Sequence, residues 1–143
     1  RPRRVPREAK GAVVIRILIA DDHAIVRAGL RQFIADQPDM EVAGEAATGT
    51  EAIAQVRAGN FEVVLLDISM PDKNGIDTLK TLKQLRPELP VLMLSGYAED
   101  QYAVNLLRAG AAGYLNKEAA ATQLVGAVRT VVGGRKFVSP ALA

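Results

Sequence analysis

Short runs of Val, Ile and Leu alternate along this chain with segments whose apolar residues recur at the spacing of a helix. The alternation repeats five times. Continuous apolar runs are typical of strands buried on both faces, and their alternation with helices is typical of a parallel sheet covered on both sides. The sequence therefore predicts an α/β fold of the (βα)5 type, built on a doubly wound parallel sheet.

The boundaries of the five strand–helix units follow from the residues that flank them. The strands are predicted at residues 14–20, 41–46, 62–67, 90–95 and 113–117, and the helices at about 25–34, 51–57, 75–85, 99–109 and 120–132. Thr50 is placed to cap the second helix, Gly59 to end it, and Gly110 to end the fourth helix. The connections are short, as is usual in α/β domains.

The basic charge of the chain is concentrated at one end. The 143 residues include 18 Lys and Arg against 16 Asp and Glu, a formal net charge of +2, yet residues 1–10 contain five of the basic residues and one acidic residue. The rest of the chain is therefore mildly acidic. With three Tyr, three Phe and no Trp, it also offers few side chains on which bases can stack. These features argue against nucleic-acid binding by the body of the chain.

The length suffices for one domain with a proper core and is short for two. We expect residues 1–12 to form a disordered basic arm, residues 13–134 to form the domain, and residues 135–143 to begin a linker. No apolar run reaches the roughly 18 residues that a membrane helix needs, so we expect no membrane contact. The absence of Cys excludes disulfides and cysteine nucleophiles and fits a reducing compartment such as the cytoplasm.

Polar residues gather where the predicted strands end. They are Asp21 and Asp22 after the first strand, Asp67 at the end of the third, Ser95 at the end of the fourth and Lys117 at the end of the fifth. In an open parallel sheet these carboxyl ends meet at the edge where ligands bind. Crowded carboxylates raise one another's pKa unless a cation is present, and oxygen ligands favour Mg²⁺. The pattern predicts a magnesium-assisted phosphoryl site.

The groups at this edge suit phosphoryl transfer. Asp67 is the candidate nucleophile, because a carboxylate can accept a phosphoryl group to form an aspartyl phosphate. Mg²⁺ and Lys117 would neutralise charge on the equatorial oxygens, and the Ser95 hydroxyl would donate a hydrogen bond to one of them. Such a site works by positioning and electrostatic stabilisation.

Four segments, in order, resemble the receiver domain of two-component response regulators. They are residues 17–23 (ILIADDH), 67–75 (DISMPDKNG), 94–96 (LSG) and 113–117 (GYLNK). The resemblance extends over about residues 14–134, and four motifs at matching spacings are far more specific than one short pattern. The Asp-Asp-His opening, the second strand and the Gly-Gly-Arg tail before Ser139 are most similar to the subfamily with a LuxR-type helix-turn-helix output domain.

The resemblance implies a flavodoxin-like fold with strand order 2-1-3-4-5 and phosphoryl transfer from a histidine kinase to Asp67. It implies that Mg²⁺ is held by Asp22, Asp67 and the main-chain carbonyl of Ser69, and that Asp21 acts through water. It also implies a transcription-regulating output domain that is absent from these 143 residues. Any binding of DNA would belong to that missing domain.

The resemblance further implies a switch. Ser95 would be the switch hydroxyl, Tyr114 the switch aromatic residue and Lys117 the partner of the phosphate. From the residues alone, Tyr114 also fits a half-buried strand residue with its hydroxyl at the surface. Ser69 and Tyr97 would border the phosphoryl group and tune hydrolysis of the acyl phosphate; exposed loop residues without a role are the alternative. A homodimer through the fourth and fifth predicted helices is a further expectation.

Two other positions, His23 and Glu118, lie at this edge. His23 is the only histidine, and a lone loop histidine is more often a solvated or capping residue than a ligand for Mg²⁺, which imidazole suits poorly. Receivers commonly have Lys-Pro after the fifth strand, often with a cis bond, whereas this chain has Lys117-Glu118. Because a cis bond before a residue other than proline costs about 2.5–4 kcal/mol, we expect a trans bond.

Two other functions share part of this pattern. A Mg²⁺-dependent phosphatase of the haloacid-dehalogenase type also uses a strand-end Asp, a hydroxyl and a Lys, but it has a second Asp where this chain has Ser69. A flavodoxin-like electron carrier needs a first loop that cradles an FMN phosphate, which Asp21 and Asp22 would repel. We therefore expect a phosphoacceptor with slow autodephosphorylation at most, and no turnover enzyme.

Overall fold

The computed structural model describes residues 14–70, 72, 74–96 and 101–138. Its strands are β1 (Ile15–Ala20), β2 (Met40–Ala46), β3 (Val63–Asp67), β4 (Val91–Ser95) and β5 (Gly113–Asn116). Its helices are α2 (Ala24–Ala35), α3 (Gly49–Ala58), α4 (Gly75–Leu85), α5 (Gln101–Arg108), α6 (Ala120–Val132) and the short 3-10 helix η1 (Lys117–Ala119). All ten predicted elements are present, and the start predicted for the fourth helix lies outside the described residues.

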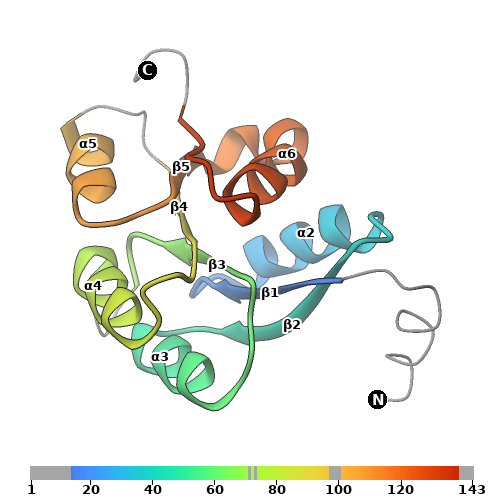
Figure 1. Ribbon diagram of the computed structural model, residues 1–143. Coiled ribbons are helices and arrows are strands. Elements are labelled where there is room, and N and C mark those ends of the chain that lie inside the picture. The colour runs from blue at the N-terminus through green and yellow to red at the C-terminus, as the bar shows by residue number, and fades with distance from the viewer. Residues whose placement is uncertain (1–13, 71, 73, 97–100, 139–143) are drawn as a thin grey trace.

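The five strands form one parallel sheet in the order β2-β1-β3-β4-β5 (Figure 1). This confirms the flavodoxin-like order 2-1-3-4-5. Every residue of β3 and β4 is buried, as expected of central strands covered on both faces. The order reverses between β1 and β3, so the ends of these two strands flank the crevice in which such folds bind ligands.

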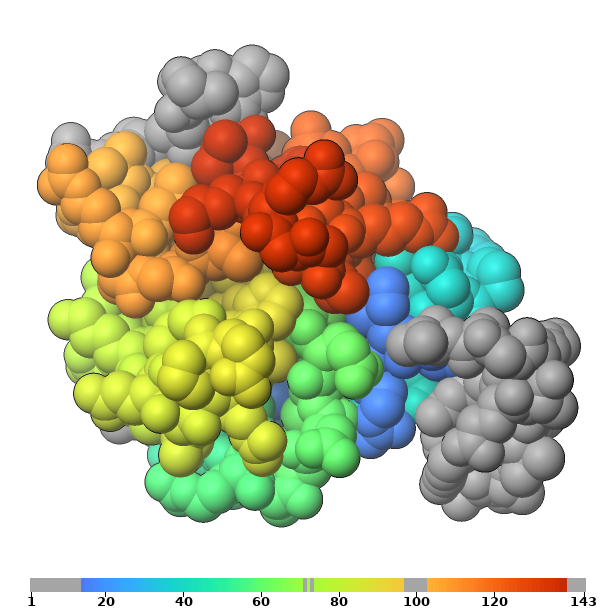
Figure 2. Space-filling model, in the orientation of Figure 1, coloured from blue at the N-terminus to red at the C-terminus, as the bar shows by residue number. Residues whose placement is uncertain are grey.

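Helices cover the sheet in two layers, with α3, α4 and α5 on one face and α2 and α6 on the other (Figure 1). Successive side chains of a strand point to opposite faces. Leu18 and Leu66 therefore pack with the first layer, whereas Ile17 and Ile19 pack with the second. The space-filling view shows side chains occupying the gaps between the ribbons (Figure 2). Two cores hold the strand ends in fixed positions.

The second helix begins differently from the prediction. The Thr48 hydroxyl, rather than that of Thr50, accepts a hydrogen bond from the N–H of Glu51 and caps α3. The Thr50 hydroxyl instead donates to Asp72 Oδ2 over 2.6 Å. The predicted Thr50 cap is therefore wrong. Thr50 lies inside α3, and its hydroxyl is hydrogen-bonded to the Asp72 carboxylate in the loop after β3. Gly59 ends the helix as predicted.

The chain after α6 returns to the sheet. Residues 135–138, which we assigned to the start of a linker, run beside β5, and Phe137 forms a parallel bridge with Gly113. The N–H of Phe137 donates to Ala112 O over 2.9 Å, and its carbonyl accepts from the N–H of Tyr114 over 3.3 Å. A Cβ atom at Gly113 would lie 2.7 Å from Phe137 O, so this close approach requires glycine.

Two expectations about the backbone can be compared with the described residues. None of their peptide bonds is cis, so the Lys117–Glu118 bond is trans as predicted. Lys117 itself opens η1 instead of closing β5, which ends at Asn116. Within the described part of the chain, no helix is long and apolar enough to cross a membrane. Residues 1–13 and 139–143 lie outside the described residues.

Candidate functional site

The acidic residues and the lysine predicted at the strand ends meet at the carboxyl edge of the sheet. The ammonium of Lys117 lies 2.8 Å from Asp21 Oδ2 and 3.2 Å from Asp67 Oδ1. Asp21 is fully buried and Asp67 is 3% exposed, while 22% of the Lys117 side chain is exposed. One cation therefore joins carboxylates from the ends of β1 and β3.

Asp21 is held in place through its main chain. Its N–H donates to Ala46 O at the end of β2 over 3.0 Å. Its carbonyl accepts from the guanidinium of Arg27 over 2.6 Å, and Arg27 also bonds Glu45 Oε1 over 3.0 Å. Arg27 was not among the residues predicted for this site. The one sequence feature that points to it is its position in the first turn of α2, which begins just after Asp21 and Asp22.

The loop after Asp67 is anchored at both ends. The N–H of Ser69 donates to Asp67 Oδ1 over 3.3 Å, and the N–H of Gly75 donates to Ile68 O over 2.8 Å. A Cβ atom at Gly75 would lie 2.7 Å from Ile68 Cα, so glycine permits the start of α4 to approach the end of β3. Asp72 bonds the N–H groups of Gly49 and Thr50, which ties this loop to α3.

For Lys117 and for Asp67 alike, burial shifts the pKa in one direction and the pairing between the two residues shifts it in the other. Burial raises the pKa of Asp67, and the Asp21 carboxylate raises it further, while Lys117 lowers it only in part. For Lys117, burial alone would lower the pKa, but hydrogen bonds and charge interactions with Asp21 and Asp67 outweigh burial and raise it. Lys117 is therefore a firmly charged ammonium opposite carboxylates that are poorly solvated.

Three buried carboxylate oxygens lie at this edge: Asp21 Oδ2, Asp22 Oδ1 and Asp67 Oδ2. Asp21 Oδ2 faces the Lys117 ammonium, and Asp22 Oδ1 lies 2.9 Å from His23 Nδ1. Asp67 Oδ2 accepts no hydrogen bond from any described residue. One donor atom from each of Asp21, Asp22, His23 and Asp67 lies within 4.8 Å of the other three. A buried carboxylate oxygen without a partner is costly, so Asp67 Oδ2 and the carboxylates around it are suited to hold a metal ion.

The described residues that form this edge lie within a segment that matches a known family. The family model for the response regulator receiver domain matches residues 17–129. The chain belongs to this family. It is a receiver domain of the two-component response regulators, as the four sequence motifs predicted.

Named relatives of this receiver domain are longer proteins. It is 37% identical over 130 residues to the response regulator GacA of Pseudomonas protegens, an alignment that covers 91% of this chain and 61% of the relative. It is 35% identical over 130 residues to the response regulator UvrY of Escherichia coli, with 91% and 60% covered. The receiver domain thus spans about three fifths of the length of these relatives.

Solved structures agree with this assignment. A LuxR-family response regulator from Aurantimonas is 31% identical, with a TM-score of 0.85 over 90% of this chain and 92% of that one. The isolated receiver domain of RcsB from Salmonella enterica, determined with the phosphate mimic BeF3⁻, is 29% identical, with a TM-score of 0.82 over 90% and 96%.

The remaining predicted residues of the receiver domain occupy different environments. Ser95 ends β4 with 1% exposure and pairs in register with Asn116 of β5. Tyr114 is also 1% exposed and packs in the core between the sheet and α5, so it is not a half-buried strand residue with a hydroxyl at the surface. Ser69 is exposed, and Tyr97 lies outside the described residues.

His23 is solvated, which is the first of the two roles expected of it. Its side chain is 64% exposed, consistent with a solvated residue, but it makes no capping hydrogen bond to α2. Its ring instead faces the acidic pair, with Nδ1 2.9 Å from Asp22 Oδ1 and 3.2 Å from Asp21 Oδ1.

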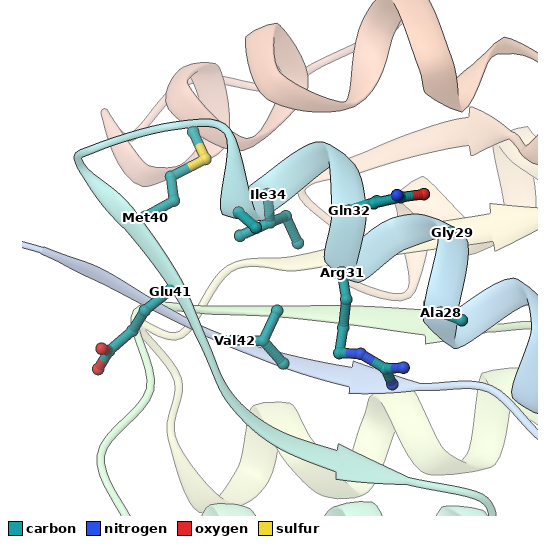
Figure 3. A pocket seen from close by; sticks show the side chains of 9 residues that line it. Ala28, Gly29, Arg31, Gln32, Ile34, Met40, Glu41 and Val42 are labelled. Atoms are coloured by element: carbon teal, nitrogen blue, oxygen red, sulfur yellow. The ribbon is translucent and has the colours of Figure 1, made fainter. Parts of the chain in front are cut away.

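A separate groove of about 690 Å³ lies between α2 and β2 (Figure 3). Ile34, Met40 and Val42 line it with apolar atoms, and Arg31 and Glu41 supply charges. None of the strand-end carboxylates lines this groove, so the candidate chemistry of the receiver domain lies elsewhere, at the carboxyl edge of the sheet.

Proposed function

We propose that Asp67 is the phosphoacceptor of this receiver domain, taking a phosphoryl group from a phosphohistidine of a histidine kinase or from a small acyl phosphate. The observation that carries the proposal is a buried strand-end carboxylate with Oδ1 beside Lys117 and Oδ2 without a hydrogen-bond partner. A carboxylate oxygen forms the new bond to phosphorus while the bond to the imidazole nitrogen, or to the acyl oxygen, breaks. The leaving imidazole or acyl carboxylate carries away the electron pair.

The same edge suits Mg²⁺. Asp22 and Asp67 would hold the ion together with the main-chain carbonyl of Ser69, and Asp21 would act through water. The donor set is entirely oxygen, and the buried Asp67 Oδ2, which has no hydrogen-bond partner among the described residues, supports the fit. When bound, Mg²⁺ supplies positive charge that offsets the oxygens of the transferred group.

Lys117 and Ser95 would stabilise the phosphoryl group once it is attached. Lys117 already lies 3.2 Å from Asp67 Oδ1, and Ser95 ends the neighbouring strand. A hydrogen bond from the Ser95 hydroxyl to a phosphoryl oxygen would move the loop after β4, and Tyr114 would change its packing in response. The coupling cannot exceed the difference between the interactions in the two states, usually about 1–3 kcal/mol.

Two residues are proposed to tune the lifetime of the acyl phosphate. Ser69 is exposed two residues after Asp67, where its side chain can affect the approach of water. Tyr97 holds the corresponding position two residues after Ser95. We infer slow autodephosphorylation at most, and no catalytic turnover of other substrates.

The wider role follows from the family. Its partners are typically histidine kinases, and we propose that such a kinase phosphorylates this domain in the cytoplasm. The phosphorylated domain would regulate transcription through a DNA-binding output domain, reached by a linker that begins after the bridge between Phe137 and Gly113. A basic arm at residues 1–12 would precede the domain at residues 13–134. A homodimer would form through α5 and α6, which flank the strand that carries Tyr114.

The test is acceptance of phosphate from acetyl phosphate. With Mg²⁺ present, intact mass should increase by one phosphoryl group in the natural protein and remain unchanged in Asp67→Asn. Asp39→Asn is the matched control, because it makes the same chemical change at a surface carboxylate paired with Arg129. Phosphorylation of Asp67→Asn would disprove the assignment, and loss in Asp39→Asn would show that the assay reports folding.

A further inference from the structure

His23 turns its ring toward the acidic edge. It precedes α2 at the capping position, yet its side chain accepts no hydrogen bond from that helix. Its Nδ1 atom lies 3.2 Å from Asp21 Oδ1 and 2.9 Å from Asp22 Oδ1. Its main-chain N–H donates to Asp21 Oδ1 over 2.8 Å, so the backbone also holds the residue beside the acids.

A buried atom without a partner lies at the same place. Asp67 Oδ2 accepts no hydrogen bond from any described residue, although Asp67 is only 3% exposed. The donor atoms of Asp21, Asp22, His23 and Asp67 all lie within 4.8 Å of one another. Ligands on opposite sides of one ion, with bonds of about 2.1 Å, lie about 4.2 Å apart. A single cation can therefore reach both the carboxylates and the imidazole after small adjustments.

The imidazole makes this donor set selective. Mg²⁺ prefers oxygen ligands and retains several waters. Co²⁺, Ni²⁺ and Zn²⁺ bind imidazole nitrogen well and bind mixed nitrogen and oxygen sites more tightly than the earlier divalent metals of the series. A ring nitrogen already placed beside the carboxylates thus adds a ligand for these ions and adds little for Mg²⁺.

We propose that His23 is a ligand for Co²⁺, Ni²⁺ and Zn²⁺ at the acidic edge, and that it makes the site bind these ions in competition with Mg²⁺. The inference rests on the proposed function in one respect, since the same carboxylates are proposed to hold Mg²⁺. An ion bound by the imidazole and these carboxylates would take the place of Mg²⁺.

The experiment is a titration of tag-free, metal-stripped protein with Co²⁺, followed by visible absorption. His23 is the only histidine in the chain, so an imidazole contribution can come from no other residue. In His23→Gln, Co²⁺ affinity should fall about tenfold or more and the spectrum should change. Calorimetry should show less than a twofold change in Mg²⁺ affinity. Unchanged Co²⁺ affinity, or an equal loss for both ions, would overturn the proposal.

A second measurement uses the natural protein alone. Zn²⁺ should protect His23 from acylation by diethylpyrocarbonate at least tenfold, whereas Mg²⁺ at saturation should protect it less than twofold. Equal protection by both ions would contradict selective ligation. The proposed function has a separate readout, the mass gain with acetyl phosphate and Mg²⁺, so either proposal can fail while the other stands.

Discussion

Two lysines at opposite edges of the sheet are partly buried, and their pKa values shift in opposite directions. Burial lowers the pKa of Lys83, and the charge of Lys136 lowers it further. Burial opposes the charge of Lys117 as well, but the carboxylates of Asp21 and Asp67 outweigh it and raise the pKa. Both lysines are partly buried, so the opposite shifts of their pKa values come from the groups that they contact.

The partners of Lys83 are main-chain carbonyls. Its ammonium donates to Pro87 O over 2.7 Å and to Leu89 O over 2.9 Å, immediately before β4 begins. Carbonyl oxygens satisfy hydrogen bonds but carry no net charge, so they offset desolvation only in part. This contact fixes the connection between α4 and β4. It is a structural interaction.

The edge around Lys117 is balanced differently. Asp21 and Asp67 share one ammonium, and Asp22 adds a third carboxylate, so the group retains an excess of negative charge. Such an excess raises carboxylate pKa values or attracts a cation. The carboxyl edge therefore needs a further cation to balance its negative charge. At the opposite edge, the Lys83 ammonium already has its hydrogen-bond partners.

The largest expected effect comes from Lys117→Ala. Removing the ammonium leaves Asp21 and Asp67 buried without a cation, which should destabilise the metal-free fold by about 2 kcal/mol after allowance for partial exposure. Loss of the charge beside the phosphoryl group should slow phosphorylation about a hundredfold or more. Urea unfolding with and without Mg²⁺, and the rate of mass gain with acetyl phosphate, measure both effects.

Mg²⁺ should restore more stability to the Lys117→Ala variant than to the natural protein, because the ion would replace the missing positive charge. If stability and phosphorylation both remain unchanged, the carboxyl edge does not depend on this ion pair, and the contrast with Lys83 has no functional meaning.

The next largest effect is expected from a substitution at Gly113, the first residue of β5. Gly113→Ala places a Cβ atom 2.7 Å from Phe137 O and 2.9 Å from Leu92 Cδ1, so the chain after α6 must move. We expect a loss of about 1–3 kcal/mol in unfolding free energy. Gly126→Ala, in α6, is the control: nothing lies within 4 Å of its Cβ position, and it should stabilise by about 0.5–1 kcal/mol. Equal destabilisation by both variants would contradict the close approach to Phe137.

Lys83→Met tests the structural edge directly. The variant keeps most of the apolar stem but loses the hydrogen bonds to Pro87 and Leu89, so it should lose about 1 kcal/mol of unfolding free energy. Phosphorylation by acetyl phosphate should proceed at the natural rate. A tenfold slower phosphorylation would show that the two edges are coupled and would break the comparison.

Asp67→Asn, which should abolish phosphorylation, should change the stability of the metal-free protein least, and it should raise that stability. Because the pKa of Asp67 is raised by folding, the folded state favours the protonated form, and ionisation at neutral pH destabilises it. Without metal, the variant should be more stable than the natural protein by about 0.5–1 kcal/mol at pH 7. The gain should disappear as the pH falls through the raised pKa of Asp67.

Thermal unfolding in the presence of a chelator at several pH values measures this difference. The control is Asp39→Asn, whose natural carboxylate has a lowered pKa because of its hydrogen bond with Arg129. That variant should lose up to about 0.5 kcal/mol at pH 7. A gain that grows as the pH falls would contradict the raised pKa of Asp67.

Much of the fold was predictable because hydrophobic spacing is a local property. The apolar runs located all five strands to within one or two residues, and the position of Asp67 at the end of such a run placed it at the carboxyl edge. Tyr114 illustrates the limit. A single aromatic residue in a strand fits either the surface or the core, and only the packing of α5 against β5 buries it.

The sequence by itself determined the alternation of strands and helices, and the family motifs within it indicated the strand order and the set of residues at the strand ends. The tertiary structure decided which of those residues touch: Lys117 pairs with Asp21 and Asp67, and Thr48 caps the helix that Thr50 was expected to cap. Periodicity acts over a few residues, whereas the ion pairs of Lys117 and the hydrogen bond of Thr50 to Asp72 join segments far apart in the chain. Their formation depends on how helices and loops pack, which no local pattern records.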